Sequence, residues 1–290
     1  MKPNIVSWNV RGLNEVEKCL RIRHLLHEWK ADIVCLQETK LKVINRKIVR
    51  SLWSTNYVDW VYLASSGASG GIVVMCDRRV VEKVEDYIGR YMVACSFKSV
   101  LDGFMWAFAG VYGPNLDVDR RLLWDEIAGV HGWWELPWCI GGDFNVARCQ
   151  SKSFGNRRLR PASLEFSECI FDLNLVDLPL AGGPATWSNN QTWTCLDHFL
   201  ISPEWESHFL DVWQKRLVCL ASDHWPILLD CGGIQSGRRY FKFESMWLKS
   251  EGFVERVKQW WISYQFEGTP NFIFANKLKA LKRDLKEWNK

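Results

Sequence analysis

The sequence GGDFN at residues 141–145 is the most informative stretch of the chain, because it places polar groups where the apolar run at residues 137–140 ends. In a β-strand, side chains alternate between two faces, so Asp143 and Asn145 would share one face while Phe144 would pack on the other. A carboxylate and an amide placed in this way can hold and deprotonate a water molecule. The same residues are equally typical of a strand that runs into an Asx-type turn, so the stretch needs support from other segments.

Polar side chains also stand at the ends of other apolar runs along the chain. Taken singly, each has an ordinary structural explanation, such as an exposed strand end or a turn. Taken together, they would supply carboxylate, amide, phenol and imidazole groups to one candidate site. These residues are Asn9, Glu38, Tyr112, Asp223 and His224.

The apolar runs predict many short strands with helices between some of them. Strands are predicted at residues 5–10, 33–36, 72–76, 91–97, 104–112, 138–140, 185–188, 196–202 and 227–231, and helices from about residue 15 and around residues 164–173. A strand, a helix and a strand open the chain, and strand-rich meanders follow. This order predicts an α/β (α+β) sandwich of mixed sheets rather than a doubly wound parallel sheet.

The pattern changes near residues 231–237, where Gly and Ser interrupt it. Beyond this point, apolar residues recur at helical spacing in two segments, at residues 253–264 and 274–288. Residues 233–290 contain 12 Lys and Arg against 6 Asp and Glu, whereas residues 1–232 contain 25 against 27. We therefore expect a near-neutral first domain and a basic, helical C-terminal extension.

Composition argues against several classes of protein. Because 48% of the residues are hydrophobic, the chain can bury a substantial core, and disorder is not expected. Its 10 cysteines include no C-x-x-C pair, which favours free thiols in a reducing compartment over disulfides or a zinc site. A strand begins directly after Met1-Lys2-Pro3, and the uncharged apolar stretch at residues 103–116 is too short to span a bilayer. We expect a soluble, intracellular protein with no membrane partner.

Six segments together resemble the motifs of the endonuclease/exonuclease/phosphatase superfamily, and they occur in that family's order. The six are SWNVRGL at 7–13, LQETK at 36–40, VYGPN at 111–115, GGDFN at 141–145, LDHFLIS at 196–202 and SDHWP at 222–226. A closer resemblance, at residues 175–188, 241–248 and 278–289, is to the endonuclease domain of plant LINE-type non-LTR retrotransposon polyproteins. The resemblance implies a four-layer sandwich of two sheets packed face to face and flanked by helices. It also implies a catalytic domain at residues 1–232 and a helical connector at residues 233–290 that in relatives would lead to reverse transcriptase.

The resemblance further implies a divalent-metal phosphodiesterase site at one rim of the sheets. Glu38 would be the principal carboxylate ligand of Mg²⁺, with Asn9 beside it and Asp223 assisting, and Mn²⁺ would also suit such oxygen ligands. Asp143 would orient and deprotonate the attacking water. Asn145 would fix that water or a phosphate oxygen of the substrate.

The remaining candidate residues would act on the phosphate group and on the residues that contact it. His224 would hydrogen-bond the scissile phosphate, and Asp197 and Asp223 would orient the imidazole. Tyr112 would donate to the phosphate or assist the leaving oxygen. In-line displacement depends on positioning and charge neutralisation more than on covalent chemistry, which suits such a set of residues. The implied partner is DNA, nicked to leave a 3′-hydroxyl at a nuclear site of action.

The chain departs from the family's pattern in two places. Cys195 stands where the family usually has Arg or Lys, two residues before Asp197, and residues 150–155 lack an acidic residue that related elements often have. These departures, and the lack of a following reverse transcriptase, leave two alternatives open. The protein could be a catalytically decayed relict that at most binds nucleic acid. It could also be an abasic-site nuclease or a phosphatase that acts on another phosphoester.

Overall fold

The chain divides into two compact units, Met1–Ile234 and Gln235–Lys290. The expected change of pattern at residues 231–237 lies mostly outside the described residues. The eight cysteines of the described part are free thiols, as predicted, and six of them are buried. The structure, a computed structural model, describes residues 2–66, 70–148, 161–189, 191–209, 211–218, 221–232, 247–248, 250, 252–268 and 270–288.

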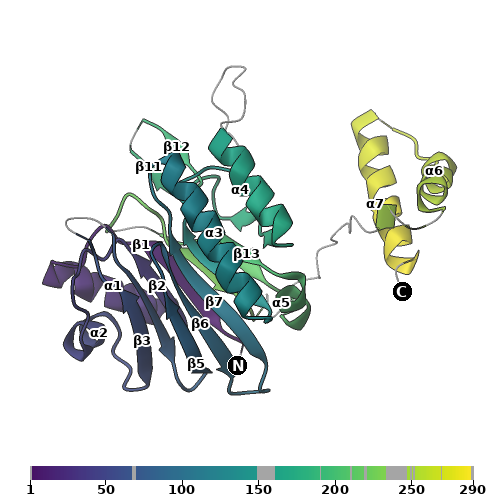
Figure 1. Cartoon of the computed structure of the whole chain (residues 1–290). Helices are drawn as coiled ribbons and strands as arrows, with labels where there is room; N and C mark the ends of the chain where they lie inside the picture. The colour runs from purple at the N-terminus through teal and green to yellow at the C-terminus, as the bar shows by residue number, and fades with distance from the viewer. Residues whose placement is uncertain are drawn as a thin grey trace. The chain divides into compact units, whose positions relative to one another are not determined.

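The first unit consists of two mixed β-sheets packed face to face (Figure 1). The first sheet contains, in spatial order, β10 (Leu180–Ala181), β14 (Trp213–Arg216), β15 (Ile227–Asp230), β1 (Asn4–Asn9), β2 (Ile33–Gln37), β4 (Ile72–Asp77) and β3 (Val58–Leu63). The second contains β5 (Val81–Ile88), β6 (Met92–Ser99), β7 (Met105–Tyr112), β8 (Trp138–Asp143), β13 (Asp197–Ile201) and β9 (Val176–Asp177). A separate short hairpin pairs β11 (Trp187–Ser188) with β12 (Trp193–Thr194). Both sheets are mixed, because β1 and β2 are parallel, as are β7 and β8, whereas β2 and β4, and β6 and β7, are antiparallel.

Helices cover the outer faces of both sheets. Helices α1 (Val16–Glu28) and α2 (Arg46–Leu52) lie on the first sheet, and α3 (Asp117–Trp133) and α4 (Pro161–Asp172) lie on the second (Figure 1). The short helix α5 (Pro203–His208) follows β13. None of the described helices is both long enough and apolar enough to cross a bilayer. The structure thus confirms the expected sandwich of two mixed sheets flanked by helices.

Apolar side chains fill the interfaces between these layers. The cluster between the sheets contains Phe199, the cluster beneath α1 and α2 contains Trp8, and the cluster beneath α3 and α4 contains Phe144. All three side chains are fully buried. Every residue of β2 is also buried, because layers cover this strand on both faces, and that explains its continuous apolar sequence.

The sequence pattern misses several elements. Helix α3 has no counterpart among the predictions, although Leu123, Ile127 and Val130 recur at helical spacing and are buried. Strand β5 is also missed, because most of its residues are partly or fully exposed at the edge of the sheet and charged residues interrupt its apolar pattern. The strand predicted at residues 185–188 is shorter than expected and covers only β11. Also without a predicted counterpart are α2, α5, β3, β9, β10, β12 and β14.

The second unit contains the two expected helices, α6 (Phe253–Ser263) and α7 (Pro270–Trp288). They pack through a small cluster that includes Trp247, Phe253 and Leu285. This unit therefore has its own apolar contacts.

Candidate active site

The ends of β1, β2, β7 and β8 bring most of the predicted site residues to one rim of the sandwich. The strand register pairs Asn9 with Gln37 across β1 and β2, and Tyr112 with Asp143 across β7 and β8. Glu38 follows Gln37 directly. Parallel strands end at the same edge of their sheet, so each pair delivers its polar residues together. The hydrogen bond from Asn9 Nδ2 to Asp143 Oδ2 (2.9 Å) joins the two sheets at this rim.

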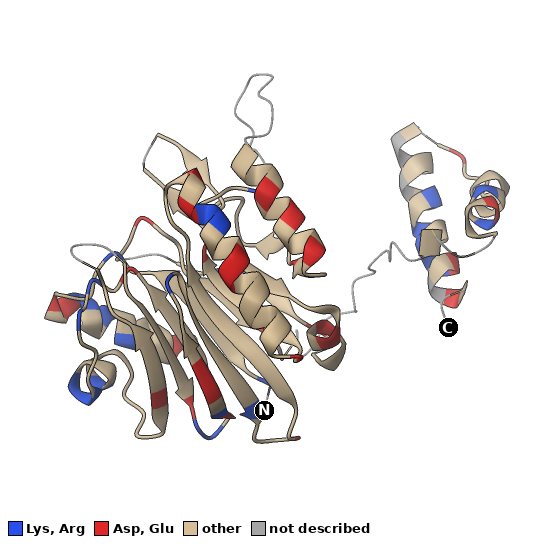
Figure 2. Ribbon diagram, viewed as in Figure 1, with Lys and Arg blue, Asp and Glu red and all other residues tan. Residues whose placement is uncertain are grey.

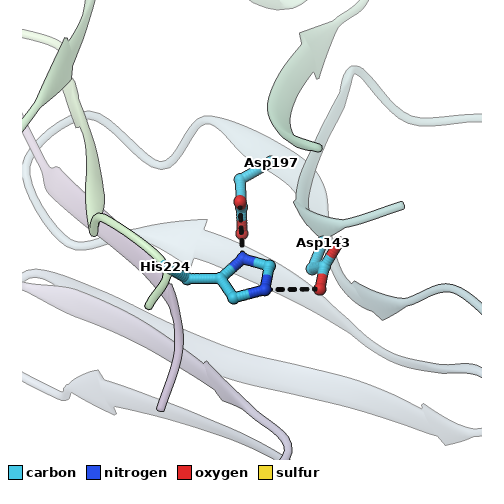
Figure 3. A group of neighbouring side chains, drawn as sticks. All are labelled: Asp143, Asp197 and His224. Atoms are coloured by element: carbon cyan, nitrogen blue, oxygen red, sulfur yellow. Dashed lines mark hydrogen bonds and ion pairs between the residues drawn. The ribbon is translucent and has the colours of Figure 1, made fainter. Parts of the chain in front are cut away.

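At the centre of the rim, one imidazole lies between two carboxylates (Figure 3). His224 Nδ1 lies 2.9 Å from Asp197 Oδ2, and His224 Nε2 lies 3.6 Å from Asp143 Oδ2. Asp197 stands opposite Asp143 in the pairing of β13 with β8, which sets the separation of the two acids. All three side chains are buried, and Asp143 has no exposed surface. The fold therefore assembles this group from segments that are far apart in the chain.

Burial and mutual interaction shift the pKa values of this group. Burial, together with the negative charge of Asp197, raises the pKa of Asp143 to about 7. Burial alone would lower the pKa of His224, but the carboxylates of Asp197 and Asp143 raise it to about 9. The imidazole is therefore protonated at neutral pH and donates its Nδ1 proton to Asp197. Asp143 has a pKa close to neutral pH, as suits a group that must accept and release a proton.

Strand β1 and the segment that precedes β15 are joined by hydrogen bonds that hold His224 in place. The indole Nε1 of Trp8 donates to the carbonyl of His224 (3.0 Å), and the Ser222 hydroxyl donates to the carbonyl of Asn9 (2.8 Å). Asn9 Oδ1 accepts from the backbone N–H of Arg11 (3.1 Å), so both ends of its amide are fixed. These hydrogen bonds tie the segment that carries His224 to the end of β1.

Thr186 is a buried residue that lies outside the six motifs of the predicted site. Its hydroxyl accepts from the backbone N–H groups of Leu196 (2.9 Å) and Asp197 (3.0 Å). Its carbonyl accepts from the backbone N–H of Trp225 (2.7 Å), which follows His224. Thr186 therefore supports the backbone on both sides of the contact between Asp197 and His224. A lone threonine in an apolar segment carries no sequence signal for such a role.

Glu38 and Tyr112 lie beside this central group. Glu38 has a left-handed backbone conformation (φ 53°), and its Oε1 lies 3.0 Å from the Nζ of Lys40. Burial, the carboxylates of Glu38 and Asp143, and a hydrogen bond to Glu38 raise the pKa of the Tyr112 phenol. The phenol therefore keeps its proton and can act as a hydrogen-bond donor.

The predicted placement of Asn145 on the same strand face as Asp143 is wrong, because β8 ends at Asp143. Asn145 adopts a left-handed conformation (φ 51°), and its N–H donates to Asp143 Oδ1 (2.9 Å). Its side-chain Nδ2 donates to the carbonyl of Gly113 (2.7 Å). The chain thus adopts the Asx-type turn that the sequence left open, and this turn keeps Asn145 beside Asp143.

Asp223 precedes His224, yet its carboxylate is held by other groups. Its Oδ2 accepts from the guanidinium of Arg11 and from the indole Nε1 of Trp187 (2.9 Å). Of the two acids expected to orient the imidazole, Asp197 is the one that hydrogen-bonds to it. The sequence could not distinguish them, because Arg11 and Trp187 come from distant segments.

The polar groups at this rim fit a divalent cation. One atom from each of Asp143, Asp197 and His224 lies within 4.8 Å of the others, and while the imidazole is protonated only the two carboxylates of this group offer lone pairs to a cation. Asp197 Oδ1 is buried without a hydrogen-bond partner among the residues that the structure describes, so it needs a positive group or a donor. Glu38 and Asn9 supply further oxygen atoms at the same rim, and oxygen ligands are those that Mg²⁺ and Mn²⁺ prefer.

The structure describes one of the two departures from the family pattern. Cys195 is half-buried, and its Sγ lies 3.7 Å from the carbonyl oxygen of Asp197. Residues 150–155 lie outside the described residues.

Comparisons with known proteins show what the chain is similar to. The model of the Endonuclease/Exonuclease/phosphatase family matches residues 6–224. Among curated proteins, the chain is similar to an exodeoxyribonuclease of Bacillus subtilis (strain 168). The two are 28% identical over 262 residues, which cover 78% of this chain and 98% of the relative.

Solved structures share the fold at low sequence identity. The AP endonuclease LMAP of Leishmania major superposes with a TM-score of 0.62 at 16% identity, covering 78% of this chain and 86% of that one. The endonuclease domain of TRAS1, a telomere-specific non-LTR retrotransposon, superposes with a TM-score of 0.60 at 13% identity, covering 79% and 97%. At these identities the likeness establishes the shared fold.

Proposed function

The chain belongs to the endonuclease/exonuclease/phosphatase family, and from this premise we propose that it is a divalent-metal-dependent phosphodiesterase that nicks duplex DNA. The observation that carries the proposal is the buried group of Asp143, His224 and Asp197 at the rim where both sheets end. Buried acids around a protonated imidazole are costly for stability, so their presence at a strand-end rim favours a catalytic role.

Glu38 and Asn9 are the residues that we assign to holding Mg²⁺, for which Mn²⁺ would substitute. The bound ion would supply positive charge that neutralises the phosphate during in-line displacement. Asp223, which the sequence also assigned to the metal, is held by Arg11 and Trp187. We therefore assign Asp223 to joining the segments that line the site.

Asp143 is the group that we assign to taking a proton from the attacking water. Its raised pKa makes it a stronger base than an ordinary aspartate, and Asn9 fixes the direction of its Oδ2. The imidazolium of His224 would donate from Nε2 to the phosphate, where negative charge develops. Asp197 would keep the imidazole protonated and correctly oriented, as their short contact favours.

Asn145 and Tyr112 complete the proposed site. Asn145 would hold the water or a phosphate oxygen, and the protonated phenol of Tyr112 would donate to the phosphate or the leaving oxygen. Both residues lie next to Asp143, one through the Asx-type turn and the other through the β7–β8 register.

DNA is the substrate that the similar proteins favour. The Bacillus subtilis relative is named an exodeoxyribonuclease, and the structural neighbour from TRAS1 is a retrotransposon endonuclease domain. Together with the resemblance at residues 175–188, which is to plant elements, the likeness to TRAS1 supports an origin in a LINE-type retrotransposon and hence a nuclear site of action. Figure 2 marks basic residues along the ribbon of α2 and acidic residues along that of α4. DNA contact would then depend on local basic groups near the rim rather than on a broad basic surface.

Two observations favour other candidate functions. The AP endonuclease of Leishmania major favours cleavage at abasic sites. Cys195, in place of the family's usual cation, favours a decayed protein that no longer turns over its substrate.

A substrate panel with Mg²⁺ and with excess EDTA separates these candidates. The panel contains supercoiled plasmid, a duplex with one abasic site and a sugar phosphomonoester. We expect Mg²⁺-dependent conversion of plasmid to open circles with 3′-hydroxyl ends. Cleavage of the abasic duplex alone would indicate an abasic-site nuclease. Hydrolysis of the monoester alone would indicate a phosphatase. No hydrolysis of any substrate with Mg²⁺ or Mn²⁺ would refute the proposal.

A further inference from the structure

We propose that Arg120 is a positioning residue that fixes Asn145 and the loop after Tyr112 for phosphoester hydrolysis, an inference that rests on the function proposed above. Arg120 lies in the first turn of α3, outside the motifs that mark the site. Only 10% of its side chain is exposed. Arginine is rarely buried to this extent without a specific set of partners, because removing its charge from water is costly.

The guanidinium group joins two loops that meet at the rim. Nε donates to the carbonyl of Pro114 (3.1 Å), and Nη2 donates to the carbonyls of Asn115 (2.9 Å) and Asn145 (2.8 Å). Asp117, in the same helical turn, accepts from Nη1 and offsets the charge. A planar guanidinium presents several donors in fixed directions, so one side chain can hold all three carbonyls at once.

The backbone at Asn145 is held in place by several contacts. Its left-handed conformation is uncommon outside glycine, and asparagine is among the few other residues that adopt it readily, so the contacts fix one of the conformations open to this residue. Its Nδ2 donates to the carbonyl of Gly113, whose own N–H donates to the carbonyl of Asp143 (2.7 Å). The two loops touch so closely that a Cβ on Gly113 would lie 2.3 Å from the carbonyl oxygen of Phe144. Arg120 therefore closes a network that links Asn145 to the end of β7.

This network lies behind the site, and Arg120 acts through Asn145 rather than on the substrate. Without the carbonyl contacts, Asn145 would leave the turn that keeps it beside Asp143. Catalysis depends on the exact placement of such groups, so a small displacement would slow turnover more than it would weaken binding.

Arg120→Lys tests this role, because lysine keeps the charge but has a single nitrogen that cannot bond to three carbonyls in fixed directions. The matched control is Arg121→Lys, one residue further along α3. Arg121 is exposed, and its guanidinium pairs with Glu165 on α4 (2.7 Å). In Mg²⁺-dependent plasmid nicking, we expect Arg120→Lys to lower kcat by about 10- to 100-fold, the range typical of residues that support a catalytic group, with KM near that of the parent. Arg121→Lys should retain the parent kcat.

A second readout does not depend on activity. In protein labelled with ¹⁵N at asparagine, the side-chain amide of Asn145 gives a pair of NMR signals that Asn145→Ala assigns by their loss. We expect Arg120→Lys to shift or broaden these signals and Arg121→Lys to leave them unchanged. Arg120→Gln, which is neutral and shorter, should give the same pattern as Arg120→Lys and replaces it if the buried lysine prevents folding.

The two readouts separate failure of this inference from failure of the proposed function. If the parent hydrolyses no phosphoester, the proposed function fails, and the Asn145 signals alone decide whether Arg120 positions that residue. The inference is overturned if a folded Arg120→Lys variant keeps the parent signals and the parent kcat. It is also overturned if Arg121→Lys lowers kcat as much as Arg120→Lys does.

Discussion

Asp197→Asn removes the charge that holds His224 in its protonated form while keeping the size of the side chain. In the parent protein, His224 donates from Nδ1 to Asp197 at 2.9 Å, and the contact is buried. The amide of asparagine can still accept a hydrogen bond, but it carries no negative charge. We therefore expect the variant to fold and its imidazole to lose most of its extra affinity for a proton.

The magnitude follows from the pKa of His224. Burial lowers this pKa, and the neighbouring carboxylates, Asp197 first, raise it to about 9 from an ordinary value of 6.5. The difference corresponds to about 3.4 kcal/mol in favour of the protonated form, at about 1.4 kcal/mol for each pH unit. Without the Asp197 charge, burial would oppose only the charge of Asp143 and weaker contributions, so the pKa should fall to about 6.5 or below. At pH 8, the imidazole would change from largely protonated to largely neutral.

An NMR titration of ¹⁵N-histidine-labelled protein in EDTA measures this pKa directly. The parent should titrate at His224 near pH 9 and Asp197→Asn near or below pH 6.5. In the nicking assay, the alkaline limb of the pH–rate profile should move in the same direction. The reasoning is refuted if His224 in the folded Asp197→Asn variant still titrates near pH 9.

Three further perturbations test other parts of the structure. His198 Nδ1 lies 3.2 Å from Asp177, and although burial lowers the pKa of His198, this carboxylate and other groups raise it to about 10. A raised pKa stabilises the fold below pH 6.5, and this stabilisation is lost toward pH 10, so from pH 7 to 9 His198 should lower the parent's free energy of unfolding by up to about 1.4 kcal/mol for each pH unit, in addition to the slope from His224. In urea unfolding, the slope of His198→Gln should be shallower than the parent's by this amount, and a slope equal to the parent's would contradict the assignment. Glu38→Gln should raise the Mg²⁺ concentration for half-maximal nicking by about 10- to 100-fold, and an unchanged requirement would exclude Glu38 as a ligand. Gly142→Ala would place a Cβ 2.0 Å from the carbonyl oxygen of Val111, so thermal unfolding should show a loss of about 3 kcal/mol, and a melting temperature equal to the parent's would show that the β7–β8 pair can yield.

The rim could be predicted from the sequence because its residues directly follow apolar runs. Asn9 ends β1, Glu38 follows β2, and Asp143 ends β8, so each stands where a buried strand reaches the edge of its sheet. The family motifs supplied the order of these segments. The structure adds the contact between Asn9 and Asp143, which joins the two sheets.

Side-chain partners at the rim could not be predicted, because they depend on groups from distant segments. Asp223 and Asp197 are equally plausible partners for His224 in the sequence. Only the fold shows that Arg11 and Trp187 hold the first. The residue at which β8 ends could not be predicted either. The alternation of side chains in a strand placed Asn145 on the same face as Asp143, but the chain forms a turn at this point.

Supporting residues could not be predicted because they act through the backbone. Arg120 and Thr186 bind backbone carbonyl or N–H groups of other segments, and any sequence can provide such groups. Helix α3, which carries Arg120, could have been found from the helical spacing of Leu123, Ile127 and Val130. The role of Arg120 at the rim could not have been predicted, because it depends on where the helix packs.

Single-turnover nicking of supercoiled plasmid shows whether the protein hydrolyses phosphodiesters in a metal-dependent reaction with Asp143 as the general base. Parent, Asp143→Asn and Asp172→Asn are compared in Mg²⁺ and in excess EDTA, with the exposed Asp172 on α4 as the matched control. We predict Mg²⁺-dependent nicking by the parent and by Asp172→Asn, and a rate about 10²- to 10⁴-fold lower for Asp143→Asn, the range expected for loss of a general base. Nicking by Asp143→Asn at the parent rate, or nicking that persists in EDTA, would contradict the account.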